Sequence, residues 1–434
     1  MLNMKTTFRR FVSRLLEFQA RRLFRTHNFK IVGVSGSVGK TSTKLAIATV
    51  LEQKYRVLVQ QGSFNDEIGL PLACFNLELP GRIFNPFAWI KVLVQMELTL
   101  HRPFSFDVLV IEIGTDAPGE VPHTLGYITP DIGVVTAVTP EHMEYFGTLD
   151  AVAAEELSIV AGSKQALVNL DDVPAKYRHK YVDKHDGRLY YGLDKDADYA
   201  FHVSSTDPVK GTTGTLTKHR RTVLSNVTFN LYGLHSAKMA AAAYAVGELL
   251  GLTHDQLKAG VQALQPVRGR MNPLAGVNGS VIVDDTYNSS PEAALAALTA
   301  LQSAQAGRRI ALLGSMNELG EETVAYHQEV GEAAAGVDLL VTLGKLANNH
   351  LGPAAVAAGL DPTRMQPAAS PTAAADYLKL ILGPGDVLLA KGSQNGVFAE
   401  EAVKLLLADP KDAAKLARQS PAWMRIKRRQ FPEL

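Results

Sequence analysis

Residues 35–44 read SGSVGKTSTK and directly follow the apolar run Ile31–Val34. A glycine-rich turn between a strand and a helix points backbone N–H groups and the positive end of the helix dipole at one concavity, which suits an anion. Apolar residues at helical spacing follow between Leu45 and Leu51, so a helix is expected after the turn. The stretch therefore predicts a strand–loop–helix unit that binds the phosphates of a nucleotide.

Two side chains in this loop have the chemistry that phosphate binding needs. The ammonium of Lys40 can reach the outer phosphates, and the hydroxyl of Thr41 can ligate the Mg2+ that bridges them. The longer phosphate-loop pattern is not met, because it requires glycine where Val34 stands, and the alternative is an ordinary strand–turn–helix connection. The residues expected to bind ATP here are Gly36, Ser37, Gly39, Lys40, Thr41 and Ser42.

Length and composition are typical of an enzyme with more than one domain. A chain of 434 residues can form two or three domains, each with its own core. The single cysteine, Cys74, excludes an internal disulfide and favours a reducing compartment, so we expect a cytoplasmic protein. No stretch approaches the length of a membrane span, and the N-terminus has no clean signal-peptide core.

Both ends of the chain are basic, although the net charge is only +1. Residues 1–30 hold eight Lys or Arg against Glu17, and residues 411–434 hold seven against two acidic residues. Apolar residues recur at helical spacing over 4–25, which predicts an amphipathic helix. Such a helix can make a weak contact with an anionic membrane, but it more often packs its stripe on its own protein. We expect that packing, no nucleic-acid binding, and a closing tail that is mobile or docked on the surface.

Short apolar strands alternate with helical segments along most of the chain, which predicts an α/β fold with mostly parallel sheets. The expected strands are 29–34, 56–60, 107–113, 132–138, 165–169, 280–284, 309–313, 339–343 and 387–390. Alternating Thr, Val and Tyr over 186–232 indicates an antiparallel annex, and Thr253–Gln256 forms a capping-box pattern that opens a helix. A domain boundary is expected near 265–272. The expected parts are an N-terminal helix over 1–29, an ATP-binding domain over 30–267, a second α/β domain over 268–410 and a tail over 411–434.

Candidate catalytic residues follow two of the expected strands. Glu112 ends the run VLVIE, at the edge where open α/β sheets bind ligands, and an apolar strand offers its carboxylate no partner. We therefore expect Glu112 to ligate the Mg2+ of the nucleotide, rather than to cap a helix or lie on the surface. His142 and Glu144 follow the next strand, and His142 is either structural or a ligand of a second metal.

Nine segments of the chain occur in the order found in one family of ligases. They are SGSVGKTSTK, GSFNDEIGLPL, VIEIGTDAPGEV, TPEHMEYFG, YGLH, VRGRM, VDDTYNSSP, LLGSMNELG and AKGSQNG. The chain thus resembles the Mur ligase family from about residue 30 to 405, most closely its D-alanyl-D-alanine-adding branch. The resemblance implies a central P-loop ATPase domain and a C-terminal Rossmann-like domain that closes over it. It also implies that ATP phosphorylates a substrate carboxylate and that an amine then attacks the acyl phosphate to give an amide, ADP and phosphate.

The same resemblance implies roles for individual residues. Lys40 would hold the phosphates, Thr41 and Glu112 a first Mg2+, and Glu112 and His142 a second Mg2+ that orients the carboxylate. Arg270 would reach a phosphate when the domains close. The residues implied on the nucleotide side are Asp285, Tyr287 and Asn288; Asn65 would face the acyl donor, and Ser393 and Asn395 the amine acceptor.

The sequence also departs from the family pattern. About thirty residues precede the phosphate loop, where a typical member has roughly a hundred that bind a UDP-sugar, so we expect that domain to be missing. Residues that are usual in the family are replaced at Ser236, Met239, Ser315 and Gln394. The helix that normally carries a carbamylated lysine at the second metal has Glu156 there. Either Glu156 ligates that metal, or Glu155 and Glu156 form a solvated helix face and the metal is lost.

Three functions remain open. The favoured one is an active ATP-dependent amide ligase acting on a cell-wall peptide precursor, because Lys40, Thr41, Glu112 and His142 are all present. A second is a ligase for a folate-like or small-peptide substrate, and a third is a non-catalytic ATP-binding partner subunit. ADP formation that depends on donor and acceptor separates the enzymes from the binding subunit.

Overall fold

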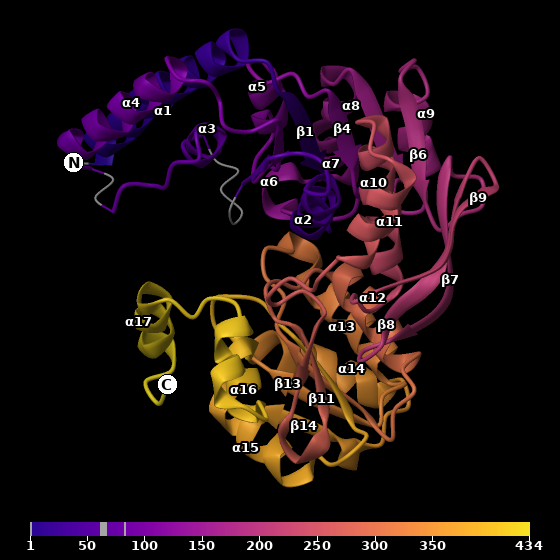
Figure 1. The fold of residues 1–434 in the computed structure, drawn as a ribbon. Helices are drawn as coiled ribbons and strands as arrows, with labels where there is room; N and C mark the ends of the chain where they lie inside the picture. The colour runs from indigo at the N-terminus through magenta and orange to yellow at the C-terminus, as the bar shows by residue number, and fades with distance from the viewer. Residues whose placement is uncertain (1, 61–66, 82–83) are drawn as a thin grey trace.

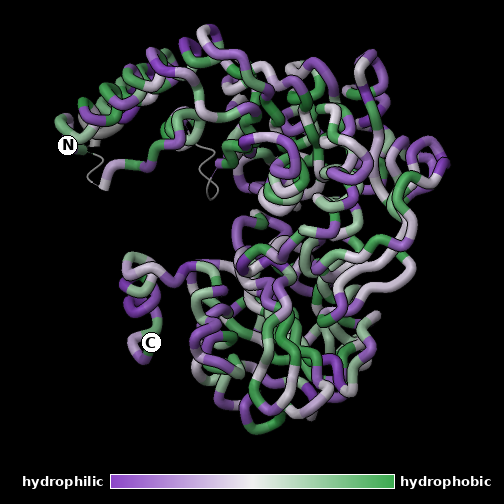
Figure 2. Tube along the Cα trace, viewed as in Figure 1, coloured by the Kyte–Doolittle hydropathy of each residue, from purple (hydrophilic) through white to green (hydrophobic). Residues whose placement is uncertain are grey.

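The computed structural model describes residues 2–60, 67–81 and 84–434. Two units, each built around a β-sheet, lie one above the other, and a pair of helices extends from the upper unit (Figure 1). The upper unit comes first along the chain, in indigo to magenta, and the lower unit is orange to yellow. Hydrophobic residues concentrate along the strands of the lower unit (Figure 2), as expected for strands buried on both faces.

Within the described ranges, the larger sheet has nine strands in the order β2-β3-β1-β4-β5-β6-β7-β8-β9. They are β1 (Lys30–Ser35), β2 (Val57–Val59), β3 (Val108–Glu112), β4 (Ile132–Val135), β5 (Gln165–Asn169), β6 (Arg188–Gly192), β7 (Tyr199–Asp207), β8 (Gly211–Lys218) and β9 (Arg221–Phe229). Neighbours from β2 to β7 run parallel, and β7, β8 and β9 run antiparallel. The mostly parallel sheet predicted for this half is confirmed.

Two details of the predicted strands are wrong. The strand expected over 132–138 ends at Val135, because the chain then turns beneath the phosphate loop, where the Ala137 carbonyl accepts a hydrogen bond from Ser37 N at 3.0 Å. The annex expected to be antiparallel over 186–232 begins with β6, which pairs parallel with β5. Alternation along a single strand does not specify the direction of its neighbours, so the sequence pattern could not separate β6 from the strands that follow it.

Helices cover both faces of this sheet, because its strands are apolar on both sides. On one face lie α2 (Lys40–Leu51), α10 (Leu234–Leu249) and α11 (His254–Gln262). On the other lie α1 (Leu2–Thr26), α3 (Gly69–Cys74), α4 (Pro86–Leu100), α5 (Glu120–Leu125), α8 (Ser158–Gly162) and α9 (Ala175–Tyr181). The capping box predicted at Thr253 is present, with both reciprocal hydrogen bonds to Gln256.

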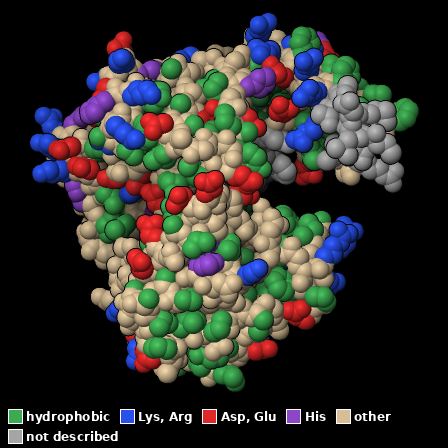
Figure 3. Space-filling model, turned by 180° about the vertical axis from the view of Figure 1, so that it is seen from behind, with side chains coloured by type: hydrophobic (Ala, Val, Ile, Leu, Met, Phe, Trp, Pro, Cys, Tyr) green, Lys and Arg blue, Asp and Glu red, His purple; other side chains and the backbone are tan. Residues whose placement is uncertain are grey.

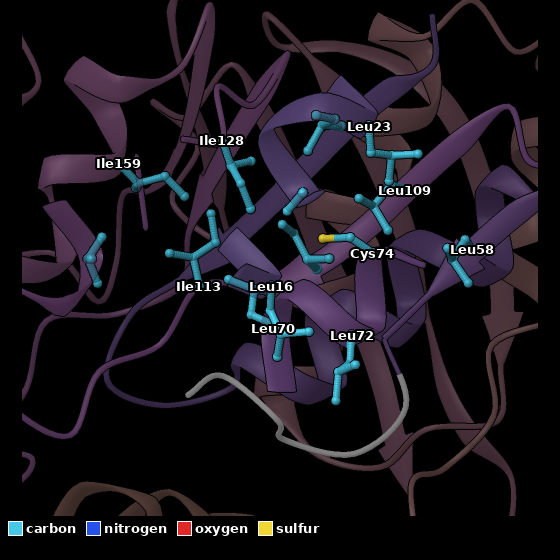
Figure 4. Close-up of a cluster of buried hydrophobic side chains, with 14 of the residues drawn as sticks. Leu16, Leu23, Leu58, Leu70, Leu72, Cys74, Leu109, Ile113, Ile128 and Ile159 are labelled. Atoms are coloured by element: carbon cyan, nitrogen blue, oxygen red, sulfur yellow. The ribbon is translucent and has the colours of Figure 1, made fainter. Parts of the chain in front are cut away.

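Helix α1 packs an apolar stripe on the body of the protein. Its buried residues are Val12, Leu16, Ala20 and Leu23. Figure 4 shows Leu16 and Leu23 in the same cluster as Leu109 of the sheet and Cys74 of α3. Burial raises the pKa of the Cys74 thiol to about 12. The amphipathic helix predicted over 4–25 is therefore confirmed, as is the packing of its stripe on its own protein.

The smaller sheet has six strands in the described residues, in the order β10-β11-β15-β12-β13-β14. They are β10 (Asn272–Ala275), β11 (Val281–Asp285), β12 (Arg309–Gly314), β13 (Leu339–Leu343), β14 (Met365–Ala368) and β15 (Val387–Lys391). Helices α12 (Pro291–Gln302), α13 (Thr323–Ala334) and α14 (Gly352–Ala357) cover one face, and α15 (Pro371–Ile381) and α16 (Ala399–Leu406) cover the other. The sequence did not predict β10 and β14, the two edge strands, because both are short and each contains a proline.

The closing tail is docked, not mobile. It forms the helix α17 (Pro421–Gln430), which begins where the Ser420 side chain accepts a hydrogen bond from Trp423 N. Lys427 on this helix is fully buried and pairs with Glu400 at 2.9 Å and Glu401 at 2.6 Å. Of the two outcomes expected for the tail, the structure has the docked one.

No helix in the described part of the chain is long and apolar enough to cross a membrane.

Candidate functional site

Both units contribute to one cavity of about 770 Å3. In the larger sheet its lining includes segments that follow β1, β3, β4 and β5, and in the smaller sheet segments that follow β11, β12 and β15. Residues from 231–239 and 264–271 complete it. Ligands of open α/β sheets bind outside the carboxyl ends of the strands, and here two such edges share one space. The cavity is therefore the place to look for the predicted site residues.

The loop between β1 and α2 needs its glycines. Gly36 has a φ of 125°, and a Cβ there would lie 2.8 Å from Ala137 N, so any side chain would push the loop off the neighbouring segment. Gly39 has a φ of 88° and precedes α2 without a side-chain cap. The first N–H groups of α2 have no acceptor within the helix, and these residues line the cavity. The loop thus presents backbone donors to the cavity, which is the arrangement that SGSVGKTSTK predicts for an anion site.

Lys40 lies across this loop and stays charged. Its side chain is almost fully buried, and its Nζ donates to the Gly36 carbonyl and lies 3.3 Å from Glu141 and 3.7 Å from Glu156. Burial by itself would lower the pKa of Lys40, but Glu141, Glu156 and Glu112 outweigh burial and raise it. The site therefore holds a permanent positive charge next to the anion-binding loop.

Thr41 and Glu112 meet at the edge of the sheet. The Thr41 hydroxyl donates to Glu112 Oε2 at 2.9 Å, and Lys44 Nζ lies 3.5 Å from the same oxygen. Val34 of β1 pairs with Glu112 of β3, so the parallel register itself brings the two strand ends together. A hydroxyl and a carboxylate are ligands that Mg2+ accepts, and the ion commonly completes its shell with waters and substrate phosphates. The donor set therefore fits Mg2+ bound to a nucleotide.

The side chains near Thr41 and Glu112 are too few to bind a metal ion without ligands from the nucleotide. Residues 2–60, 67–81 and 84–434 contain no group of three His, Cys, Asp or Glu side chains arranged as a metal site. A metal site built from three such side chains is thus not present in the described residues. A Mg2+ ion that relies on phosphate oxygens needs only one or two carboxylates.

His142 lies where the two units meet. It precedes the short helix α6 (Met143–Phe146) in a left-handed conformation, with a φ of 49°. Its Nδ1 is 3.0 Å from Glu318, which belongs to the second unit, and its Nε2 is 3.6 Å from Asp116. His142, Glu112, Asp116 and Glu318 all line the cavity. Asp116 and Glu318 were not predicted, although each follows the end of a strand, as Glu112 does.

Glu155 and Glu156, at the end of helix α7 (Leu149–Glu156), point to different places. Glu156 Oε2 accepts hydrogen bonds from the Ser35 hydroxyl and from Gly36 N, and its Oε1 is the oxygen nearer Lys40. Glu155 instead accepts from two N–H groups at the start of α5, at 2.7 and 2.8 Å. Both side chains are buried, at 6% and 1% exposure, so the expected alternative of a solvated helix face is wrong.

Arg270 connects the second unit to the phosphate loop. Its guanidinium donates to the Thr41 hydroxyl at 3.3 Å and lies 4.4 Å from the centre of the Tyr287 ring. The backbone on either side is fixed, because Gly269 N donates to Asp284 at 3.1 Å and Met271 N donates to Asp285 at 3.1 Å. The structure thus brings Arg270 and Thr41 together, although 229 residues separate them in the chain.

The residues expected on the nucleotide side form one cluster at the end of β11. Asp285, Tyr287 and Asn288 all line the cavity. Lys391, at the end of the neighbouring strand β15, donates to Asp285 at 2.6 Å and to the Asn288 carbonyl at 3.0 Å. Lys391 was not predicted, yet it ends the apolar strand VLLAK just as Glu112 ends VLVIE.

None of the three residues expected to bind the two substrates is found lining the cavity. Asn65 lies outside the described residues. Ser393 is fully buried, and its hydroxyl donates to the Ser315 carbonyl at 2.7 Å, whereas Asn395 is exposed; neither lines the cavity. Their neighbours Gln394 and Asn317 do line it, and Asn317 donates to the Gln394 carbonyl at 2.6 Å.

A further pair was not predicted from the sequence. Lys238 of α10 and Asp172 after β5 are 2.6 Å apart, and both line the cavity. Asn169 donates to Asp172 at 2.8 Å, which fixes the carboxylate. His235, one turn before Lys238, is half-buried, and desolvation lowers its pKa. These side chains lie too far apart in the sequence to form a motif.

Family models match most of the chain. The model of the Mur ligase middle domain matches residues 34–82 and 91–247, and the model of the Mur ligase glutamate ligase domain matches residues 269–394. The UDP-N-acetylmuramoyl-tripeptide–D-alanyl-D-alanine ligase of Escherichia coli is 30% identical over 387 residues, which are 87% of this chain and 76% of that protein. The ligase of the same name from Bacillus subtilis is 29% identical over 391 residues, or 88% and 76%.

Solved structures share the fold. The MurF ligase of Thermotoga maritima, in complex with ADP, has a TM-score of 0.74 at 24% identity and covers 93% of this chain and 84% of its own. The folylpolyglutamate synthase of Mycobacterium tuberculosis, also complexed with ADP, has a TM-score of 0.64 at 16% identity and covers 88% and 91%.

The two matched domain models and the ligases named above place the chain among the ATP-dependent ligases that form amide bonds and release ADP, and the contact of Arg270 with the phosphate loop agrees with that class. At 30% identity over most of its length, the chain belongs to the Mur ligase family, whose cofactors are ATP and Mg2+.

Proposed function

We propose that this ligase joins a carboxylate of a peptidoglycan-precursor peptide to the amine of D-alanyl-D-alanine or a closely similar dipeptide, in the cytoplasm. The relatives named as UDP-N-acetylmuramoyl-tripeptide–D-alanyl-D-alanine ligases support these substrates. The single observation that carries the mechanism is the contact of Arg270 with Thr41, because it brings a second cation to the phosphate loop from the unit that would hold the amine. We also propose that the two domains span 30–267 and 268–410, in line with the two sheets.

In the first step, an oxygen of the donor carboxylate attacks the γ-phosphorus of ATP while the bond to the β–γ bridging oxygen breaks and ADP leaves. The transferred group carries negative charge throughout, so the protein needs fixed positive charge and alignment more than a nucleophile. Lys40, held charged by its carboxylate neighbours, and Arg270, fixed by stacking on Tyr287, supply that charge from opposite sides. The N–H groups of the loop hold the phosphates in line.

In the second step, the amine of the acceptor attacks the acyl carbon, and phosphate leaves with the former carboxylate oxygen as the amine loses a proton. We propose that Asp285, Tyr287 and Asn288 hold the nucleotide, that Asn65 faces the donor, and that the loop with Ser393 and Asn395 faces the acceptor. In that loop, Gln394 is the residue that lines the cavity, so it would make the direct contact.

Two sets of residues would hold Mg2+. Thr41 and Glu112 would hold the ion that accompanies the nucleotide phosphates. Glu112, His142 and Glu156, through its Oε1, would hold a second once bound substrates draw them together, because without substrates these three do not form a metal site. Bound there, Mg2+ supplies charge neutralisation for the phosphoryl group and the carboxylate. Glu156 Oε2 already accepts two loop hydrogen bonds, so the same side chain would also hold the loop in shape.

The test is ADP formation by the purified chain with peptidoglycan-precursor peptides and D-alanyl-D-alanine, each alone and together. We expect ADP only when donor and acceptor are both present, and Lys40→Ala to lower the rate by about a thousandfold or more in the fraction of protein that circular dichroism shows to be folded. ATP binding without stimulated ADP release would make the chain a binding subunit, and stimulation by folates would move it to the other ligase class.

Glu156 has its own test, because a glutamate needs no carbon dioxide to present its carboxylate. The rate should not change on adding bicarbonate. Glu156→Gln should lower turnover at ordinary Mg2+ and recover part of it at high Mg2+, since the amide is a weaker ligand. Turnover equal to the parent at every Mg2+ concentration would remove Glu156 from the metal site.

A further inference from the structure

Helix α1 keeps part of its apolar surface exposed after it has packed on the protein. Phe11 is 60% exposed and Phe18 is 58% exposed. They are seven residues apart, two helical turns, so they lie on the same face. The exposed residues Arg14, three after Phe11, and Arg25, seven after Phe18, fall on that face. This outward face therefore alternates aromatic rings with arginines.

Helix α4 carries a second exposed stripe. Phe87 is 79% exposed, Ile90 56%, Val94 53% and Leu98 48%. Their spacings of three, four and four residues place them on one side of the helix, opposite the buried Trp89 and its neighbours. A surface helix normally has one apolar face and one polar face, whereas α4 is apolar on both. Removing the outer apolar face of α4 from water would lower the free energy.

The two stripes join into one surface. Helices α1 and α4 lie side by side where they extend from the upper unit (Figure 1). A groove of about 150 Å3 runs between them, and Phe11 and Ile90, which belong to the two stripes, both line it. We call helices α1 and α4 together the arm, and their exposed surface made of Phe11, Phe18, Phe87, Ile90, Val94 and Leu98 the arm face. Large contiguous apolar patches of this kind mark interaction sites on soluble proteins.

The arm face is surrounded by positive charge. Residues 8–26 contain six arginines and one glutamate, and residues 84–100 contain one lysine and one glutamate. Both glutamates are already paired with arginines of α1, at 2.6 Å for Arg21 and 2.5 Å for Arg22. The exposed cations that remain on the arm include Arg10, Arg14, Arg25 and Lys91. Figure 3 shows Lys and Arg side chains next to hydrophobic ones on the arm, at the upper right.

We propose that the arm face docks on the surface of a membrane that contains anionic lipids. Aromatic and aliphatic side chains enter the boundary between headgroups and acyl chains, and the arginines beside them contact the lipid phosphates. A second copy of the chain fits less well, because packing two arm faces together would place arginines against arginines. No rearrangement is needed, since Leu16 and Leu23 already anchor α1 in the core (Figure 4).

The test is flotation of the purified full chain with lipid vesicles. We expect binding to vesicles of phosphatidylcholine mixed with phosphatidylglycerol and much weaker binding to phosphatidylcholine alone. Raising the salt to about 1 M should weaken the binding, because the Debye length then falls to roughly 3 Å. This measurement does not involve ATP, so its outcome is independent of the ligase reaction.

Variants separate the apolar and ionic contributions. Phe87→Ser combined with Ile90→Ser should lower vesicle partitioning about tenfold or more, since both side chains would lose their burial in lipid. Arg10→Gln combined with Arg14→Gln should lower it to a similar extent, and only with anionic vesicles. The matched control is Leu380→Ser on α15, an exposed leucine (85%) far along the chain, which should change nothing.

Each remaining outcome overturns the proposal. These outcomes are no binding to anionic vesicles, equal binding by the Phe87/Ile90 variant, or self-association through the arm face in sedimentation without vesicle binding. A soluble acidic protein that binds the arm face while vesicles do not would also overturn it. Unchanged thermal unfolding and unchanged ADP formation in the absence of vesicles establish that the variants are folded.

Discussion

The two basic ends of the chain look alike in sequence and behave differently in the structure. The arm leaves Phe11 and Arg14 exposed to solvent, although α1 is well packed. The C-terminal segment turns inward instead: Lys427 is fully buried and pairs with Glu400 and Glu401, and Arg418 pairs with Glu400 at 2.8 Å. One basic segment thus faces solvent, and the other is built into the protein.

The difference lies in the surface on which each segment packs. Helix α16 presents Glu400 and Glu401 in its first turn, and both are buried, so they need cations. The body under α1 is a cluster of Leu, Ile, Val and aromatic side chains, which accepts an apolar stripe and leaves arginines outside. The charge of a segment therefore does not decide where it goes; the groups already buried on its partner do.

The C-terminal segment also contacts a residue of the candidate site, whereas the described arm residues do not line the cavity. Arg418 donates to the carbonyls of Thr286 and Tyr287, at 2.7 Å each. The Tyr287 ring has Arg270 at 4.4 Å and Arg418 at 5.4 Å from its centre. We infer that Arg418 is a positioning residue, which acts on the phosphate through Tyr287 and Arg270.

The largest expected effect is the loss of tail docking in Lys427→Ala. Removing one partner leaves two buried carboxylates without their ammonium, which costs about 3 kcal/mol or more. Because the tail can open locally, the amides of α17 should exchange hydrogen about a hundredfold faster. Arg429→Ala, two residues away and exposed, should leave the exchange unchanged. Similar exchange in both variants would mean that the buried pairs do not hold the tail.

The pH dependence of docking sharpens the same comparison. Burial opposes ionisation of Glu401, but hydrogen bonds from Lys427 and Gln419 outweigh it and lower its pKa. The stabilisation by the ionised group is present above the ordinary Glu pKa of about 4.3 and is lost as the pH falls through the lowered value. The protection of the α17 amides from hydrogen exchange should therefore stay constant from about pH 7 to about pH 5 and decrease at lower pH. In Lys427→Ala, burial without the ammonium would raise the pKa of Glu401, so the hydrogen-exchange protection of α17 should increase on acidification. The same pH response in the wild-type chain and in Lys427→Ala would contradict the pairing of Lys427 with Glu401.

Arg418→Ala should have a smaller effect, on the reaction itself. We expect turnover to fall about tenfold with little change in the KM for ATP, because Arg270 loses alignment and the loop still binds the nucleotide. The fold should survive, since Lys427 still pairs with Glu400 at 2.9 Å. Arg418→Lys keeps a charge near Glu400 but cannot reproduce the fork of hydrogen bonds, so it should be impaired as well. Turnover equal to wild type in both variants would show that Arg418 does not position Arg270.

The smallest effect is expected on the arm. Arg22 pairs with Glu97 on the surface, with side chains 34% and 40% exposed. Exposed ion pairs contribute little, because water screens them and ordering two long side chains opposes the attraction. Arg22→Ala should leave the midpoint of thermal unfolding unchanged within error. A clear decrease in the unfolding midpoint would show that the exposed Arg22–Glu97 pair stabilises the protein as the buried Lys427 pairs do.

The sequence predicted what depends on local pattern. The nucleotide loop follows from SGSVGKTSTK, and Glu112 follows from its place at the end of an apolar strand. The strands in both sheets that are apolar throughout were also predicted, because burial on both faces leaves a readable run. The edge strands β10 and β14 were missed, since their prolines and short length remove that signal.

What the sequence could not specify is pairing between distant segments. Glu318 meets His142 only because the two units close around one cavity, and Arg418 meets Tyr287 only because the tail folds back. The direction of Glu156 depends on one helical register: a shift of one residue would place Glu155 at the loop in its stead. Such contacts are long-range, and no spacing within a motif encodes them.

The most direct test of the central claim, phosphoryl transfer to a carboxylate, follows an isotope. The donor peptide would be labelled with 18O in the reacting carboxylate, and the phosphate released during turnover would be analysed by mass spectrometry. One labelled oxygen should appear in each phosphate, because the carboxylate oxygen that attacks ATP leaves with phosphorus when the amine displaces it. Phosphate without the label, formed at the same rate as the amide, would show that the carboxylate is never phosphorylated and would contradict the mechanism.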